Sequence, residues 1–209
     1  MTLTYMDYGV DIQPLDKLHA DINACRLCHN HVPAILKPES MKRGNSGNIA
    51  IIGQGPGKHE LKKREAFSGP SGKKLNQWLV RSGAQANNPR AAIYFTSVVK
   101  CVAPSDNYLP QMIRNCRLFL NRQLVLIRPS LIITLGKIAY EELSIVPIQY
   151  DQALCKAFRT DNYALLTSLG FHYTLLAWPH PSGLNRWHND ANNQSLLDAS
   201  FDIVRQHLL

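Results

Sequence analysis

NIAIIGQGPG, at residues 48–57, joins a short apolar run to a turn that holds three glycines and a proline. A brief apolar run that ends at a turn is typical of a buried strand in a parallel sheet. Glycine accepts backbone conformations that other residues avoid, and it lets another molecule approach the main chain closely. In open α/β sheets, ligands bind just beyond the carboxyl ends of the strands. The turn at 53–57 is therefore a candidate ligand-binding loop, and a tight turn that binds nothing is the alternative.

The composition is that of an ordinary folded protein. The chain has 209 residues, 45% of them hydrophobic and 18% charged, which suits one α/β domain. No apolar run approaches the roughly 18–20 residues that cross a bilayer, and the first residues, MTLTYMDYGVDIQ, lack the basic region of a signal peptide. We therefore expect a single domain over residues 1–209, cytoplasmic, monomeric and without a membrane partner. The net charge of +8 favours a polyanionic partner, with nucleic acid first.

Apolar runs alternate with amphipathic patterns along the chain. The expected strands are residues 49–52, 92–99, 130–135 and 171–178, and the expected helices are 12–24, 73–82, 111–127, 137–143 and 189–208. A charged loop is expected at 58–65, and 145–170 shows no clear pattern beyond a short helix around 153–158. This alternation predicts an α/β fold, with three α/β/α layers around a four-stranded parallel sheet.

Chemically unusual residues follow each expected strand. They lie at the strand ends as Gly53 to Gly57, Ser97 to Cys101, Leu135 with Gly136, and His180 to Trp187. Parallel strands end at the same edge of a sheet, so we expect these segments to meet. His180 is suited to donate a hydrogen bond to a developing oxyanion or to transfer a proton, and capping of the last helix is the alternative. Leu184, an apolar residue in a polar loop, suits a wedge between stacked bases or ordinary packing under the loop.

Four cysteines form two pairs that point to a metal site. Cys25 and Cys28 form a C-x2-C pair, and fourteen residues separate Cys101 from Cys116. Four thiolates from two chain segments hold either zinc or a [4Fe–4S] cluster. The second pair is too wide for a zinc ribbon, which weakens the zinc interpretation, and ordinary buried cysteines are the remaining alternative. Cys155 falls outside the pattern and is expected to be a buried thiol.

In this order and spacing, the motifs resemble those of the uracil-DNA glycosylase superfamily, most closely its iron–sulfur branch, family 4. GQGPG at 53–57 resembles the family's G-E-A-P-G, and the family's phenylalanine follows at the same distance as Phe67 in AFSGPSG. TSVVKC at 96–101 resembles T-N-V-V-K-C, and HPS at 180–182 matches the closing motif. The pattern between them, C…L…Q…P…I…LG, is matched by Cys116, Leu120, Gln123, Pro129, Ile132 and Leu135-Gly136. HPSGLNR also resembles the mismatch-specific branch, which has Asn where His180 stands.

The resemblance implies a role for each matched position. Phe67 would stack on a flipped base, His180 would stabilise negative charge on the base oxygen O2, and Glu60 would crowd C5 and exclude thymine. Gln54 and Gly55 would be catalytic positions together with His180, with their backbone against the base or the attacking water. The remaining substrate positions are Gly53, Gly57 and Ser97. Pro181, Ser182, Leu184, Asn185 and Arg186 would grip the DNA strand and fill the gap left by flipping. Cys25, Cys28, Cys101 and Cys116 would ligate a structural [4Fe–4S] cluster.

Two positions depart from the family pattern. The family's base-reading Asn is Ser97, and its first-motif Glu is Gln54. A serine cannot make the bidentate contact by which an Asn amide distinguishes uracil from cytosine, a loss of about 1–3 kcal/mol of discrimination. Nothing in the sequence desolvates Lys100, so a Schiff-base nucleophile is not expected there.

The resemblance therefore implies a monofunctional DNA glycosylase that flips uracil or a modified pyrimidine out of DNA and hydrolyses its glycosidic bond. The substitution at Ser97 makes modified bases of bacteriophage DNA an alternative substrate, with a role in antiviral defence rather than DNA repair. A non-catalytic DNA-binding relative that keeps the fold and the cluster is the rival from another class.

Overall fold

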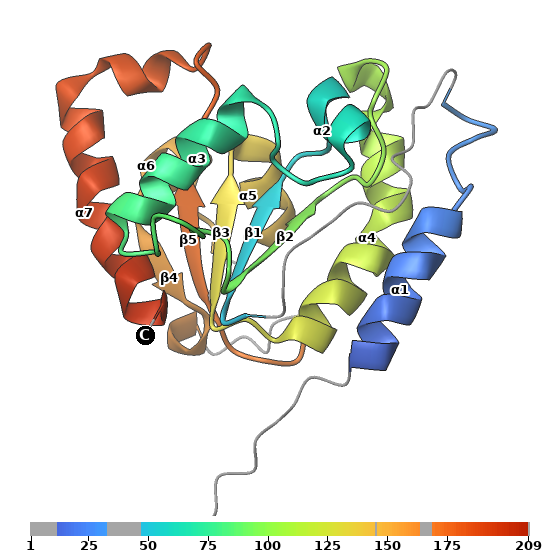
Figure 1. The fold of residues 1–209 in the computed structure, drawn as a ribbon, viewed down its shortest axis with the longest axis horizontal. Helices are drawn as coiled ribbons and strands as arrows, with labels where there is room; N and C mark the ends of the chain where they lie inside the picture. The colour runs from blue at the N-terminus through green and yellow to red at the C-terminus, as the bar shows by residue number, and fades with distance from the viewer. Residues whose placement is uncertain (1–11, 33–46, 145, 164–168, 209) are drawn as a thin grey trace, which may run out of the picture.

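The computed structural model describes residues 12–32, 47–144, 146–163 and 169–208. Its central sheet has the spatial order β2-β1-β3-β5-β4 (Figure 1). The parallel strands are β1 (Ile49–Gly53), β2 (Ile93–Ser97), β3 (Leu131–Leu135) and β5 (Thr174–Trp178). The register pairs Gly53 with Ser97 and Leu135 with Trp178, so the carboxyl ends of the strands lie together at one edge. The predicted α/β architecture is confirmed.

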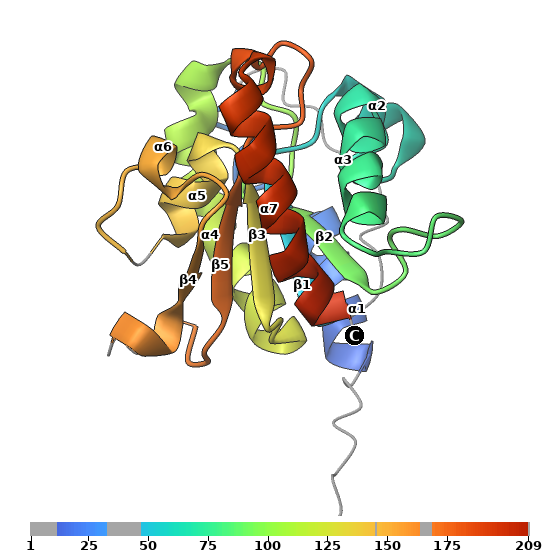
Figure 2. The same ribbon diagram turned by 90° about the vertical axis from the view of Figure 1, so that its left-hand side faces the viewer.

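Helices cover both faces of the sheet (Figures 1 and 2). One face carries α1 (Ile12–Ala24), α4 (Leu109–Ile127), α5 (Lys137–Leu143) and α6 (Tyr150–Ala153), and the other carries α3 (Pro70–Arg81) and α7 (Ala191–Leu208). Short 3-10 turns are η1 (Asp106–Tyr108), η2 (Thr160–Tyr163) and η3 (Arg186–Asn189). The helices predicted at 12–24, 111–127, 137–143 and 189–208 are therefore confirmed to within two residues.

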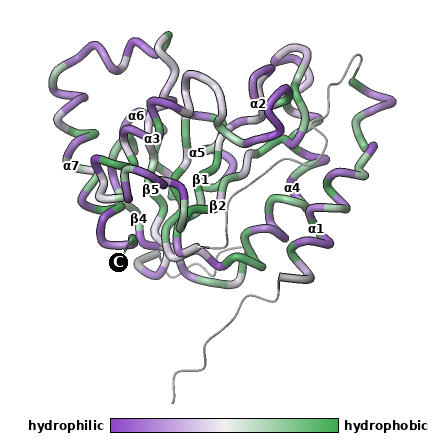
Figure 3. The backbone as a smooth tube through the Cα atoms, in the orientation of Figure 1, coloured by the Kyte–Doolittle hydropathy of each residue, from purple (hydrophilic) through white to green (hydrophobic). Residues whose placement is uncertain are grey.

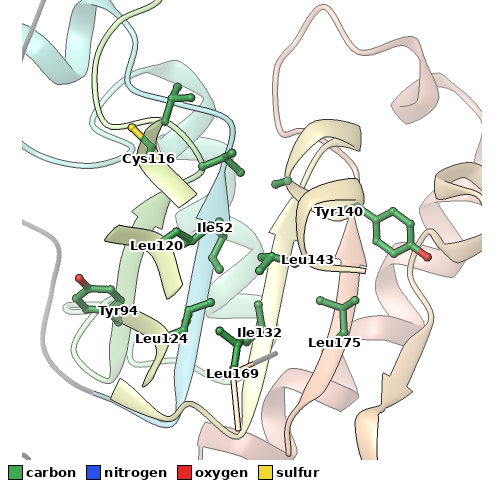
Figure 4. Packing of buried hydrophobic residues seen from close by; sticks show 14 of the residues in the cluster. Ile52, Tyr94, Cys116, Leu120, Leu124, Ile132, Tyr140, Leu143, Leu169 and Leu175 are labelled. Carbon is green, nitrogen blue, oxygen red and sulfur yellow. The ribbon is translucent and has the colours of Figure 1, made fainter. Parts of the chain in front are cut away.

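Alternate residues of the buried strands build two separate cores. Ile52 and Ile132 face the α4 side, where Leu120 and Leu124 of that helix cover them (Figure 4). Ile51 and Ile133 face α3 and α7. Every residue of β1 and β3 is buried, which is why these strands appear in the sequence as unbroken apolar runs. Figure 3 shows hydrophobic residues along the central strands, while hydrophilic residues recur along the outer helices, α2 (Lys58–Lys63) among them.

The prediction of four strands is wrong in one respect, because a fifth strand closes one edge of the sheet. β4 (Ala157–Arg159) pairs antiparallel with β5, and it replaces the helix expected around 153–158. The exposed and half-buried residues of β4 leave little hydrophobic pattern to detect. The unpaired backbone of β5 supplies the hydrogen-bonding partners that make this segment a strand.

Two helices differ from prediction near the carboxyl edge. α2 occupies the segment expected to be a charged loop, and the Glu60 carboxylate caps it by accepting the Gly57 N–H at 3.0 Å. α3 starts at Pro70 instead of residue 73, because proline has no N–H to leave unpaired in the first turn of a helix. Both helices border the end of β1.

Candidate active site

A cavity of about 200 Å³ opens at the carboxyl edge of the sheet. It lies where β1 and β2 end, between α2 and the start of α3, and the segment after β5 closes one side (Figure 1). Its lining combines apolar, hydroxyl and charged side chains with exposed backbone: Gly55, Pro56, Gly57, Glu60, Ala66, Phe67, Ser71, Phe95, Thr96, Ser97, Lys100 and His180. Six predicted substrate or catalytic residues meet here, whereas Gly53 and Gln54 lie beside the cavity.

The glycines of the first turn allow its backbone to approach its neighbours closely. A Cβ on Gly55 would lie 2.6 Å from Val99 Cγ2, and one on Gly53 would lie 2.9 Å from Cζ of Phe67. The turn is held to the end of β2 by the Val98 N–H, which donates to the Gly53 carbonyl at 2.8 Å. The glycines therefore make room for neighbouring side chains and leave main chain along the cavity wall.

Phe67 lines the cavity from the loop between α2 and α3. Its ring centroid lies 5.8 Å from that of Phe95, and the two rings are tilted by 57°. Its backbone is left-handed, with φ 52°, which is rare for a bulky residue. A Cβ on Gly72 would lie 1.6 Å from the Phe67 carbonyl oxygen, so α3 packs directly against this main chain.

Glu60 joins the two loops that border the cavity. One carboxylate oxygen accepts the Gly57 N–H and the other accepts the Gly69 N–H, each at 3.0 Å. Glu60 thus lies in the cavity lining, and both of its carboxylate oxygens are occupied by main-chain donors. A carboxylate held in this way braces the loops on either side of Phe67.

The Ser97 hydroxyl already donates its proton to a hydrogen bond within the protein. Its Oγ donates to the Val99 carbonyl at 2.7 Å, so toward the cavity it acts as an acceptor. Lys100 is only 7% exposed, and its Nζ donates to Thr96 Oγ1 at 2.8 Å and to the Ser97 carbonyl. The sequence does not indicate this burial of an amine in the lining. Its polar contacts continue inward, because Thr96 Oγ1 donates to Gln123 Oε1 at 2.9 Å.

The hydrogen bonds of His180 assign its tautomer. The Ser182 N–H donates to Nδ1 at 3.2 Å, so a neutral ring carries its proton on Nε2. Burial, and secondarily the charge of His188, lowers the pKa of His180, which favours this neutral form. The His180 carbonyl accepts His188 Nε2 at 3.0 Å and Asn185 Nδ2 at 3.1 Å. His188, which sequence reasoning missed, thus helps to hold the histidine loop.

Some of the predicted DNA-contacting residues are held within the loop, and the others are exposed to solvent. Pro181 is buried, and Asn185 is bonded within the loop through both its side-chain nitrogen and its oxygen. Ser182 Oγ accepts the Leu184 N–H at 3.2 Å. Leu184 itself is 93% exposed at the tip of the loop, and Arg186 is also exposed. The loop is therefore internally braced and presents an apolar side chain and a cation to solvent.

All four predicted metal-binding cysteines line one small pocket beside α1 and α4. Cys28 and Cys116 are buried, Cys25 and Cys101 are half-buried, and none of these four described cysteines forms a disulfide. Burial raises the pKa of Cys116, and the nearby Lys100 opposes this shift. The side chains are not gathered into a closed site: within the described ranges, no group of three or more His, Cys, Asp or Glu side chains is placed to hold a metal ion. The donor set nevertheless fits a thiolate-ligated group, since four sulfurs from two segments share one pocket.

Two further predictions concern residues away from the cavity. Cys155 is buried, as expected, and burial raises the pKa of its thiol to about 12. None of the helices in the described ranges has the length and apolar character needed to cross a membrane.

Sequence comparisons agree with the motifs found at this edge of the sheet. The family model described as uracil DNA glycosylase superfamily matches residues 41–203. A type-4 uracil-DNA glycosylase of Archaeoglobus fulgidus is 33% identical over 136 residues, which cover 61% of this chain and 62% of that protein. Type-4 uracil-DNA glycosylases of Sulfurisphaera tokodaii and Pyrobaculum aerophilum are each 30% identical, over 59% and 64% of this chain. The matched regions span 54% to 65% of the length of these three relatives.

Proposed function

Because the chain belongs to the uracil DNA glycosylase superfamily, with type-4 enzymes among its relatives, we propose that it is a monofunctional DNA glycosylase. It hydrolyses the N-glycosidic bond of uracil or a modified pyrimidine in DNA, after the nucleotide has been flipped out of the duplex. The observation that carries the proposal is that an aromatic ring, a hydroxyl acceptor and a neutral histidine line one cavity at the carboxyl edge. Phe67 supplies the ring, Ser97 the acceptor and His180 the donor.

Catalysis in this proposal is stabilisation of the departing base as an anion. The bond between C1′ and the base nitrogen breaks, its electron pair moves onto the base, and the negative charge is shared with the O2 oxygen. The Nε2–H of His180 donates to that oxygen, a role that a neutral imidazole performs without transferring its proton. A water oxygen then bonds to C1′, and the proton that it loses is taken up by the departing base anion, which leaves as the neutral base.

The acidic residue in the cavity lining is not placed to act as general base. Both oxygens of Glu60 accept main-chain N–H groups, so the carboxylate is held between the two loops. This favours a dissociative path in which the glycosidic bond is largely broken before water attacks. Glu60 then acts by shape, at the side of the cavity where the family excludes thymine.

DNA binding is assigned to the rim of the cavity. Lys58, Lys62 and Lys63 of α2 are exposed beside the cavity and suit phosphate contacts. Leu184, 93% exposed, is the wedge that fills the space left by the flipped nucleotide. Exposure of a large apolar side chain has no stabilising purpose in the free protein, which supports this role.

We assign a structural [4Fe–4S] cluster to Cys25, Cys28, Cys101 and Cys116. When bound, the cluster would cross-link the segment after α1 to α4 and to the segment after β2, without taking part in turnover. Iron analysis and absorbance near 400 nm of protein purified without oxygen test this, with Cys116→Ser expected to lose both signals. Zinc without iron would contradict the assignment.

The base that is cut is tested directly. Duplexes carrying uracil, hypoxanthine, 5-hydroxymethyluracil or modified cytosines are incubated with the protein, and abasic sites are revealed by alkaline cleavage. Release of uracil supports a repair enzyme, and release of phage-type bases alone supports a role in antiviral defence. The defence alternative is favoured over strict selection of uracil by Ser97, which offers the base a single acceptor. If the protein binds DNA but releases no base, and the His180→Ala variant binds DNA equally well, the non-catalytic alternative is established.

A further inference from the structure

The backbone of Phe67 needs support from its surroundings. A left-handed conformation is costly for a bulky residue and persists only where neighbouring groups enforce it. Glu60 braces the loop from one side through the Gly69 N–H. On the other side lies Arg90, which precedes β2 and is outside the motifs that predicted the site.

Arg90 holds this loop through its whole guanidinium group. Nη2 donates to the carbonyl oxygens of Ala66 at 3.0 Å and of Phe67 at 2.9 Å. Nη1 donates to the Glu65 carboxylate at 2.9 Å, and Nε donates to Asn76 Oδ1 at 3.0 Å. The two carbonyls that it binds are those of Phe67 and of the residue before it. The guanidinium therefore fixes the peptide units that determine the direction of the Phe67 ring.

The same guanidinium also reaches the aromatic wall of the cavity. Its carbon lies 4.6 Å from the ring centroid of Phe95, the ring that packs against Phe67. Only 18% of the Arg90 side chain is exposed, so these contacts are shielded from water. A planar fork is required for this arrangement, because a lysine ammonium cannot span two carbonyls, a carboxylate and an amide while lying on a ring.

From these contacts we propose that Arg90 is a positioning residue that holds Phe67 as the stacking platform for the flipped base. The inference rests on the proposed glycosylase function, since stacking on Phe67 is part of it. Arg90 does not reach the cavity itself, so it acts through the loop and through Phe95. Its loss should weaken capture of the base while leaving the rest of the DNA contact intact.

The test compares Arg90→Lys with the wild-type protein in three measurements. Single-turnover base release should slow by about 10- to 100-fold, as for the loss of charge-assisted hydrogen bonds that orient a binding group. Affinity for a duplex with an abasic site, which has no base to stack, should change by less than about twofold. Hydrogen exchange of the amides at residues 66–69 should accelerate by about tenfold or more, with exchange in the strands unchanged. Arg81→Lys is the matched control, because Arg81 also lies over an aromatic ring, at 4.9 Å from that of Phe201, and pairs with Asp198 at 2.7 Å.

The outcomes separate this proposal from the proposed function. If the wild-type protein releases no base from any duplex, the glycosylase proposal is refuted. The hydrogen-exchange measurement would still test whether Arg90 holds the loop at residues 66–69. Unchanged base release and exchange in Arg90→Lys would overturn the positioning role, as would a loss of abasic-site binding in proportion to the loss of rate. If Arg90→Lys does not fold, Asn76→Ala removes one anchor of the guanidinium, and a smaller change in the same direction is expected. No change in that variant would equally overturn the proposal.

Discussion

Removal of the His180 imidazole is the sharpest test of the proposed chemistry. The structure gives this side chain a proton on Nε2 and a lowered pKa, so at neutral pH it is an uncharged donor in a largely buried site. Loss of one preorganised donor to a developing oxyanion typically costs about 10²–10³ in rate, or about 2.7–4 kcal/mol. A neutral donor belongs at the lower end of this range, and we expect His180→Ala to slow single-turnover base release by about 100-fold.

His180→Asn is the control that isolates the donor. His180→Ala removes the acceptor of the Ser182 N–H, which costs about 0.5–1.5 kcal/mol of stability, whereas in His180→Asn the amide oxygen replaces that acceptor, as in an Asx turn. Only the Asn variant keeps a side-chain N–H at the cavity, so it should retain most of the rate and lose no more than about tenfold. The difference between the two variants therefore measures the hydrogen bond to the base.

The assay is alkaline cleavage of labelled duplexes with enzyme in excess, on whichever base the substrate panel selects. The wild-type rate should also be flat between about pH 7 and about pH 9, because the imidazole remains neutral over that range. Equal rates in the Ala and Asn variants, or a wild-type rate in His180→Ala, would refute the donor role. A rate that falls as the histidine deprotonates would show that the imidazolium is the active form.

Three other predictions follow from particular contacts. Ser97→Asn restores a donor and acceptor pair at the cavity and should raise the preference for uracil over cytosine by about 10- to 100-fold, measured as a ratio of kcat/KM; an unchanged ratio would remove residue 97 from base reading. Gly72→Ala places a Cβ 1.6 Å from a main-chain oxygen of the cavity loop and should cost about 3 kcal/mol in urea unfolding, whereas Gly183→Ala, with no atom within 4 Å of the new Cβ, should cost little. Burial lowers the pKa of His180 and of His188, so the unfolded chain binds protons that the folded chain does not, and the free energy of unfolding should decrease as pH falls below about 6.5. A urea midpoint that rises on acidification from pH 7.5 to pH 5.5 would contradict this last prediction.

The parallel strands could be predicted from the sequence because their burial restricts them to apolar residues. A strand buried on both faces must be apolar throughout, as β1 and β3 are. The meeting of Ser97 and His180 was predictable for a related reason, since each lies at the end of a strand and parallel strands end at one edge. Phe67 lies in the loop between α2 and α3, and only its match to the family motif pointed to the site. β4 could not be predicted in this way, because its pairing depends on the free edge of β5 more than on its own residues.

The electronic and conformational state of the site depends on contacts between distant segments. Arg90 stands 23 residues from the Phe67 carbonyl that it binds, and Lys100 becomes a buried amine only when the cavity closes around it. The proton on His180 is assigned by a backbone N–H, and the two oxygens of Glu60 are occupied by backbone N–H groups as well. By itself, the sequence determined the four parallel strands, the glycine turn of NIAIIGQGPG and the residues that follow the strand ends, because local pattern and chain order are sufficient for these. Only the tertiary structure decided which donors and acceptors remain available to a base, because hydrogen bonds and burial are properties of atoms brought together by folding.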